Sequence, residues 1–118
     1  MDKRILVVDD DDFIRNLIKE FLKEIMQKDS NIYTTSNGKE ALEILENKKI
    51  DLIISDVEMP VMDGRELLKE LEKNNNKTNV IIMSGTSCRS EFSDFKNVVG
   101  FLEKPFGIYE LAKLICKK

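Results

Sequence analysis

Residues 51–64 read DLIISDVEMPVMDG, and this stretch decides the fold class. Its apolar run Leu52-Ile53-Ile54 is rich in β-branched side chains, which is typical of a strand buried on both faces of a sheet. The run ends at Ser55-Asp56, and a loop containing Pro60 and Gly64 separates it from the next segment. A doubly buried strand of this kind favours a parallel sheet covered by helices on both sides.

Similar apolar runs recur along the chain. Strands are predicted at residues 5–8, 31–35, 80–83 and 99–103, in addition to the run at 52–54. Between them, apolar residues spaced three and four apart predict helices over 13–26, around 41–45 and 67–71, and over 108–116. Because strands and helices alternate, the sequence predicts an α/β fold built from βαβ units around a parallel sheet.

One connection departs from this regular alternation. Glu91 to Asn97 offers only Phe92 and Phe95 as apolar anchors, so the helical pattern there is weak. The segment between the fourth and fifth strands therefore predicts a short or irregular helix.

Length and composition suit one globular domain over residues 1–118, with 42% hydrophobic and 35% charged residues. The net charge of −3 has no basic concentration, so direct binding of nucleic acid is not expected. No apolar run is long enough to span a bilayer and no cleavable leader is visible, so we expect a cytoplasmic protein with no membrane contact.

The cysteine and histidine contents restrict the chemistry. Cys88 and Cys116 lack the paired spacing of a zinc site, and we interpret both as free thiols. The chain has no histidine, which excludes Ser-His and Cys-His nucleophile systems. Any reaction must therefore use carboxylates, lysines, hydroxyl groups or a metal ion.

Polar residues follow successive predicted strands. Asp9-Asp10 follow the first strand, Asp56 the third, Ser84 the fourth and Lys104 the fifth. Ligands of open parallel sheets bind at the carboxyl ends of the strands, so these side chains are expected at one edge. Clustered carboxylates require a cation, and oxygen ligands select a hard ion such as Mg²⁺. A carboxylate beside Mg²⁺ can act as a covalent nucleophile toward phosphorus, with a nearby lysine offsetting the charge that develops.

Each of these residues also has an ordinary structural interpretation. Asp11 and Asp12 suit a helix cap or a solvated charge, Ser84 a turn or cap, and Lys104 an exposed surface. Phe101 on a strand is usually part of the core. The joint placement at successive strand ends is what favours a site, because no single residue supplies it.

Three segments resemble the response-regulator receiver family, the CheY-like domains of two-component signalling. They are ILVVDDD at residues 5–11, the DLIISDVEMPVMDG run at 51–64 and FLEKPF at 101–106, and the similarity covers essentially the whole chain in order. The resemblance implies a doubly wound (βα)5 flavodoxin-like fold with strand order 2-1-3-4-5, an arrangement that the family itself exemplifies.

The resemblance also implies a role for each residue. Asp56 matches the phosphoacceptor, Asp9 and Asp10 match the acidic pair that holds Mg²⁺, and the backbone carbonyl of Glu58 matches the position that completes the metal shell. Lys104 matches the lysine that contacts the phosphoryl group, and its bond to Pro105 is expected to be cis. Ser84 and Phe101 match the hydroxyl and the aromatic ring that change position on phosphorylation.

The expected function is that of a phosphotransfer switch. A sensor histidine kinase or a histidine phosphotransfer domain would donate the phosphoryl group, and an altered surface would engage a downstream target that the sequence does not identify. The chain would catalyse only its own phosphorylation and dephosphorylation. The segment between Ser84 and Lys104 is shorter than usual for the family, and this affects the face that commonly binds partners.

Two other functions remain open. A phosphatase acting on external substrates would need an added general acid or base and a covering cap, for which the short loops leave no room. A constitutive interaction module would keep the fold without phosphorylation; the intact acceptor set argues against it, and the altered fourth connection keeps it open.

Overall fold

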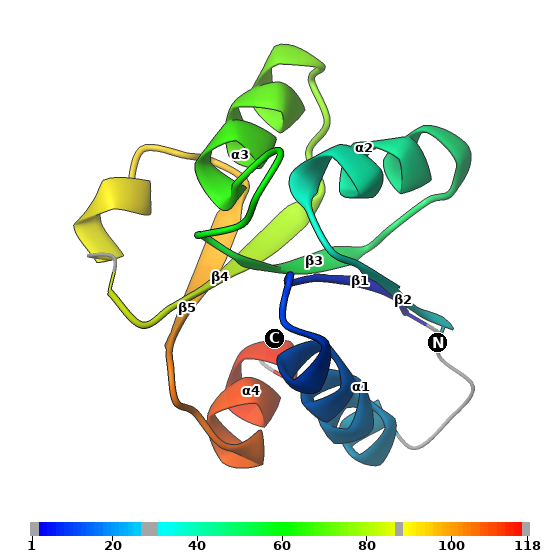
Figure 1. The fold of residues 1–118 in the computed structure, drawn as a ribbon, viewed down its shortest axis with the longest axis vertical. Coiled ribbons are helices and arrows are strands. Elements are labelled where there is room, and N and C mark those ends of the chain that lie inside the picture. Colours follow the sequence, from blue (N-terminus) through cyan, green and yellow to red (C-terminus); the bar gives the residue numbers. More distant parts are fainter. Residues whose placement is uncertain (1–2, 27–30, 87–88, 117–118) are drawn as a thin grey trace.

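The computed structural model describes residues 3–26, 31–86 and 89–116, and Figure 1 shows their arrangement. The strands are β1 (Arg4–Val8), β2 (Asn31–Thr35), β3 (Leu52–Asp56), β4 (Asn79–Ser84) and β5 (Val98–Glu103). The helices are α1 (Asp12–Met26), α2 (Gly38–Asn47), α3 (Gly64–Lys73) and α4 (Ile108–Ile115), with a short 3₁₀ turn, η1 (Arg89–Phe92).

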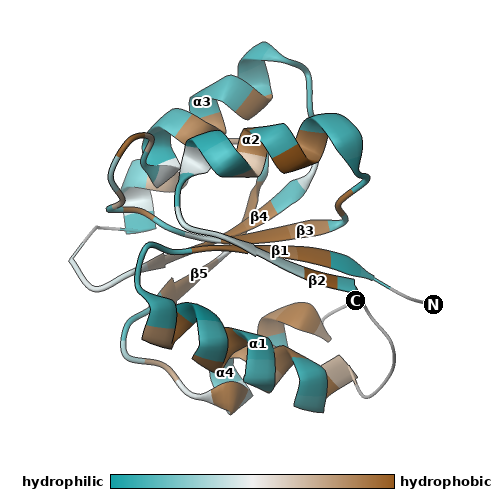
Figure 2. Ribbon diagram, turned by 45° about the vertical axis from the view of Figure 1, so that its right-hand side comes forward, coloured by the Kyte–Doolittle hydropathy of each residue, from teal (hydrophilic) through white to brown (hydrophobic). Residues whose placement is uncertain are grey.

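The strands in this part of the chain form one parallel sheet in the order β2-β1-β3-β4-β5. Helices α2 and α3 cover one face, and α1 and α4 cover the other (Figures 1 and 2). The predicted fold class and strand order are therefore confirmed. The strand ends differ from the expected ones by one or two residues, and Ser84 is the last residue of β4 rather than the first residue after it.

The sheet is the centre of two apolar cores. All five residues of β3 are buried, as expected for a strand with helices on both sides. Successive side chains point to opposite faces, so Leu6 and Ile53 pack with α2 and α3, whereas Ile5 and Ile54 pack with α1 and α4. The central strands are coloured mainly hydrophobic in Figure 2, whereas the helices carry both hydrophobic and hydrophilic residues, as expected of amphipathic helices.

Side-chain caps start the two helices that follow β2 and β3. The Asn37 side chain accepts a hydrogen bond from the backbone N–H of Glu40 and so caps α2. Asp63 and Glu66 form a reciprocal capping box at the start of α3, each side chain accepting from the other's backbone N–H. These local signals fix where each helix begins, close to the carboxyl ends of the strands.

The fourth connection contains η1 in place of an α-helix, which agrees with the weak periodicity of this segment. Phe92 is the buried residue of η1, at 2% exposure, and it packs against the same core as α3. Asn97 is also buried, and its Nδ2 donates to the carbonyls of Asn76 and Thr78, each at 2.8 Å. One aromatic anchor and one buried amide thus take the place of a repeating apolar stripe.

Three further observations bear on expectations from the sequence. The Lys104–Pro105 peptide bond is cis. Cys116 is a free, exposed thiol, whereas Cys88 lies outside the described residues. Among the described residues, no helix combines the length and the apolar character needed to cross a membrane.

Candidate functional site

Three carboxylates meet at the carboxyl edge of the sheet. Asp9 and Asp10 directly follow β1, and Asp56 ends β3, the strand paired with β1. One oxygen from each of these residues lies within 4.8 Å of the other two. Asp9 and Asp56 are buried, whereas Asp10 is exposed, so the cluster opens to solvent on one side. The structure therefore brings together the three carboxylates that the strand ends predicted.

Lys104 reaches this cluster from the loop after β5. Its Nζ lies 3.1 Å from Asp9 Oδ2 and 3.3 Å from Asp56 Oδ1. The loop is fixed at its base because the backbone N–H of Lys104 donates to the Ser84 carbonyl at 2.9 Å. Lys104 contributes one positive charge beside a cluster of three carboxylates, so this group of four side chains keeps an excess of negative charge, which favours a bound cation.

Burial changes the acidity of the central carboxyl group. Desolvation raises the pKa of Asp56, and the charge of Asp9 raises it further, while Lys104 and the backbone N–H of Val57 oppose the shift. For Lys104, burial by itself lowers the pKa, but the charges of Asp56 and Asp9 outweigh it and raise the pKa above its usual value. The lysine is therefore held as an ammonium ion beside Asp56.

Ser84 and Phe101 lie on the paired strands β4 and β5. Ser84 is buried, and its Oγ accepts a hydrogen bond from the backbone N–H of Thr86 at 3.1 Å. Strand register places Met83 opposite Asp56, so Ser84 lies one position farther along the edge. The half-buried ring of Phe101 packs against the core under α2 and α3, with its centroid 6.2 Å from the Phe92 ring.

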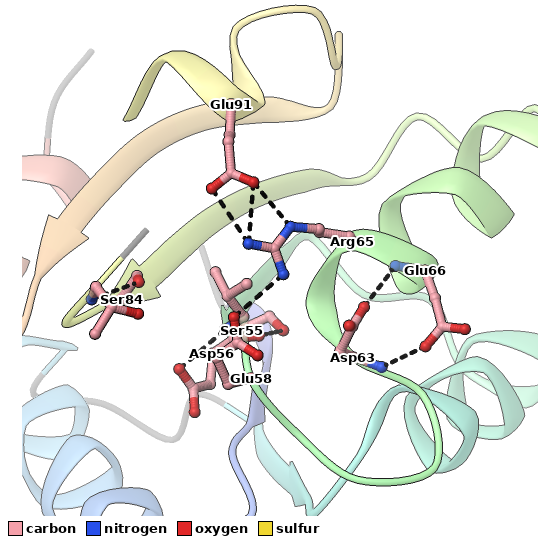
Figure 3. Close-up of polar contacts among 10 residues, drawn as sticks. Ser55, Asp56, Glu58, Asp63, Arg65, Glu66, Ser84 and Glu91 are labelled. Atoms are coloured by element: carbon pink, nitrogen blue, oxygen red, sulfur yellow. Dashed lines mark hydrogen bonds and ion pairs between the residues drawn. The ribbon is translucent and has the colours of Figure 1, made fainter. Parts of the chain in front are cut away.

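Glu58 follows Asp56 by two residues, but its side chain is directed away from the cluster. Its Oε2 accepts a hydrogen bond from Arg65 Nη1 at 3.2 Å (Figure 3). The structure thus does not bring the Glu58 carboxylate together with the carboxylates of Asp9, Asp10 and Asp56. The expectation for this position concerned its backbone carbonyl, for which no contact is described.

The aspartates after β1 have two different roles: some belong to the carboxylate cluster, and others hold the start of α1. Asp11 Oδ1 accepts from the backbone N–H groups of Phe13 and Ile14, so Asp11 caps α1, in line with its structural interpretation. Arg15 donates to the Asp9 carbonyl at 2.8 Å and forms an ion pair with Asp12. Arg15 was not among the residues predicted for the site, although its spacing of three residues from Asp12 is a usable signal for an ion pair.

The ion pairs of Arg65 are also not predicted by the sequence. It pairs with Glu58 and also with Glu91, from which it is separated by 26 residues. Such a long-range pair has no spacing signal, because it depends on where the fourth connection lies relative to α3. Tertiary structure alone identifies it.

The sheet and its edge define an α/β protein with a cluster of carboxylates and a lysine at the carboxyl ends of parallel strands. Comparison with known proteins gives the family: residues 5–116 match the response regulator receiver domain. The chain belongs to this family. It accordingly has a phosphoacceptor role in two-component signalling.

Individual relatives agree with this assignment. The chain is 39% identical over 111 residues to the protein-glutamate methylesterase/protein-glutamine glutaminase of Bacillus subtilis, covering 92% of this chain and 31% of that protein. It is 34% identical over 117 residues to sensor kinase CckA of Brucella abortus, covering 94% of this chain and 12% of the kinase. The chain thus spans less than a third of either relative.

Solved structures agree with the fold. The response regulator protein TrrA from Thermotoga maritima, solved in complex with Mg²⁺ and BeF, has a TM-score of 0.82 and 36% sequence identity, covering 98% of this chain and 97% of that one. Chemotaxis response regulator CheY4 of Vibrio cholerae has a TM-score of 0.86 and 27% identity, covering 99% and 98%.

Proposed function

We propose that Asp56 is the residue that accepts the phosphoryl group. The observation that carries this proposal is the contact of one buried carboxylate with both Lys104 and a second acidic group. Asp56 Oδ1 accepts hydrogen bonds from the Val57 N–H, at 2.9 Å, and is 3.3 Å from Lys104 Nζ. No described residue donates to Oδ2, so Oδ2 is the oxygen that can attack phosphorus.

The reaction is a displacement at phosphorus. Asp56 Oδ2 forms a new O–P bond while the P–N bond of a phosphohistidine breaks, and the leaving imidazole nitrogen keeps the electron pair and takes up a proton. Lys104 offsets negative charge on the phosphoryl oxygens as they pass between donor and acceptor. The product is an aspartyl-phosphate, and its hydrolysis by water returns the carboxylate.

Asp9, Asp10 and Asp56, with the backbone carbonyl of Glu58, are the groups that would hold Mg²⁺. The donor set fits this ion because it consists of oxygen atoms, carries excess negative charge and opens to solvent at Asp10, so that water can complete the shell. When bound, Mg²⁺ supplies charge stabilisation for the transferring phosphoryl group. Lys104 alone leaves part of the acidic charge uncompensated.

Ser84 and Phe101 are the proposed switch residues. The Ser84 hydroxyl can donate a charge-assisted hydrogen bond only when a phosphoryl oxygen is present. In the phosphorylated state it would therefore move toward that oxygen. Phe101 packs beside Phe92, and a change at the end of β4 reaches it through the paired strand β5. The surface formed by η1 and β5 would then differ between the two states.

The proposed donor is a sensor histidine kinase or a histidine phosphotransfer domain. An apolar groove of about 350 Å³ adjoins Lys104 and supports the docking of such a protein beside the acceptor. Its lining side chains are Ile14, Leu17, Ile18, Phe21, Lys104, Pro105 and Phe106. We propose that the reaction takes place in the cytoplasm, without direct contact to nucleic acid and without turnover of other substrates.

The test is phosphorylation by a small phosphodonor with Mg²⁺, read as a mass increase of the intact protein. Wild type should gain one phosphoryl group and Asp56→Asn should gain none, because the amide is not a nucleophile. Asp94→Asn makes the same chemical change at an exposed carboxylate of the fourth connection and should behave as wild type. Equal phosphorylation of Asp56→Asn and wild type would refute the assignment.

A further inference from the structure

One side chain of α3, Arg65, contacts both the loop after Asp56 and the segment η1 (Figure 3). On the η1 side, Arg65 Nε lies 3.0 Å from Glu91 Oε2 and Nη2 lies 3.2 Å from Glu91 Oε1. On the loop side, Nη1 lies 3.2 Å from Glu58 Oε2. One guanidinium group therefore bridges two segments that are far apart in the sequence.

The two contacts of Arg65 differ in strength. Glu91 is bound at two points, a geometry that fixes the orientation of both groups, and its side chain is 40% exposed. Glu58 is bound at one point, and its side chain is 65% exposed, where water competes more strongly. The contact of Arg65 with Glu58 is therefore the weaker of the two.

The bridge is continuous with the core on the η1 side. The guanidinium carbon of Arg65 lies 5.9 Å from the ring centroid of Phe92, which is buried. The Phe92 ring packs beside Phe101 of β5, and Arg89 lies over the Phe101 ring at 5.3 Å. A displacement of Arg65 thus acts on a packed set of aromatic rings that ends at β5.

The bridge is also closely fixed to the acceptor. Arg65 follows Gly64, whose backbone N–H donates to the Val57 carbonyl at 2.8 Å. A Cβ atom at Gly64 would lie 2.6 Å from the Asp56 carbonyl oxygen, so the start of α3 is in direct contact with the acceptor's backbone. Because this packing is tight, a shift of the Asp56 backbone would also shift the start of α3, where Arg65 lies.

We infer that Arg65 is a positioning residue that couples the state of Asp56 to the position of η1, through Glu58 on one side and Glu91 on the other. This inference rests on the proposed function. Negative charge added at Asp56 repels the Glu58 carboxylate and attracts the Arg65 guanidinium, so the contact between them changes. Because Arg65 binds Glu91 at two points, η1 follows.

The experiment measures amide hydrogen exchange of residues 89–92 in the presence of Mg²⁺, with and without beryllofluoride, the phosphoryl mimic. In wild type, the mimic should change these exchange rates by about two- to five-fold, the range expected for partly exposed ion pairs. Arg65→Ala should bind the mimic and lose this change, and Arg65→Lys, which keeps the charge but not the two-point contact, should fall between. Lys69→Ala removes a charge from an exposed position of the same helix and should respond as wild type.

Glu91→Gln tests the same bridge from its other end. It should also separate η1 from the site without altering α3, so it keeps the experiment decisive if Arg65→Ala folds poorly. A response of η1 that is as large in Arg65→Ala and Glu91→Gln as in wild type would overturn the inference. Loss of mimic binding in a folded Arg65→Ala protein would also overturn it, because Arg65 would then belong to the site itself.

Failure of the proposed function has a different signature. In that case wild type would not bind beryllofluoride at all. Both the role of Asp56 as acceptor and the inference that rests on it would then be refuted. If wild type binds the mimic and η1 does not respond, only the coupling through Arg65 is refuted.

Discussion

The third and fourth connections of the sheet cover the same face by different means. The third contains α3, ten residues with a reciprocal cap and the buried residues Leu67, Leu68 and Leu71. The fourth contains η1, four residues with Phe92 as their buried side chain. A helix is thus one way to cover a sheet, and an aromatic anchor with polar contacts is another.

The two connections also differ in what holds their backbones. In α3, helical hydrogen bonds and the capping box satisfy the backbone N–H and C=O groups, so the backbone needs no hydrogen bonds from other elements. In the fourth connection, Asn97 supplies two hydrogen bonds to the turn before β4, and Arg65 binds Glu91 from outside the segment. The fourth connection therefore depends on other elements, which suits a segment that responds to events elsewhere.

The largest expected effect comes from removing the anchor of η1. Phe92→Ala should lower the free energy of unfolding by about 3–5 kcal/mol, since a buried aromatic ring is lost and a cavity remains. Urea unfolding measures this, and Lys96→Ala, at an exposed position of the same connection, should change stability by less than about 0.5 kcal/mol. A cost below about 1 kcal/mol for Phe92→Ala would show that the ring does not anchor the segment.

Metal binding should depend on the carboxyl edge of the sheet and not on the fourth connection, because the carboxylates lie at the ends of β1 and β3. Free Mg²⁺ at one hundred times its Kd should stabilise the fold by about 2.7 kcal/mol. Thermal unfolding with Mg²⁺ or with a chelator measures this, and Asp10→Asn should lose most of the gain. Asp94→Asn should keep it, and an equal loss in both variants would contradict a specific site.

Two glycine substitutions compare the packing of the two connections, one at the start of α3 and one directly after β4. Gly64→Ala should destabilise by about 1–3 kcal/mol, since its Cβ would lie 2.6 Å from the Asp56 carbonyl oxygen. Gly85→Ala places its Cβ 3.8 Å from the Lys104 side chain, an ordinary contact, and should be tolerated. Chemical denaturation of both variants tests this, and equal costs would show that the two positions are packed alike.

The smallest expected effect is a difference in pH dependence between wild type and Asp56→Asn without metal. Burial, and then Asp9, raise the pKa of Asp56 in the folded state, so the folded protein holds this proton more tightly than the unfolded chain does. The contribution of Asp56 to stability is therefore greatest below its unfolded pKa and declines as pH rises through the folded pKa. Asp56→Asn should be relatively more stable at neutral pH, and urea unfolding should show this advantage shrinking on acidification. An advantage that grows on acidification would contradict the raised pKa.

Much of the fold followed from local patterns. The run at 52–54 predicted a doubly buried strand, and β3 is buried at every position. The weak pattern between 91 and 97 predicted an irregular segment, and the structure has η1 there. Patterns of this kind are readable because the period of the apolar residues reports which faces of an element are covered.

The acidic cluster was also accessible from the sequence, since parallel strands place the residues that follow them at one edge. Asp9, Asp10, Asp56 and Lys104 meet there, as their positions after the strands indicated. The side-chain direction of Glu58 was not accessible, because its partner Arg65 lies on a helix whose approach to the loop depends on close packing at Gly64.

The sequence by itself determined the parallel sheet, its buried strands and the set of charged residues at its carboxyl edge, because each of these depends on spacing along the chain. Only the tertiary structure decided that Arg65 joins Glu58 to Glu91, and that Phe92 and Phe101 pack together behind it. Such contacts depend on the distance between segments that no local pattern relates. They arise when two connections cover the same face of one sheet.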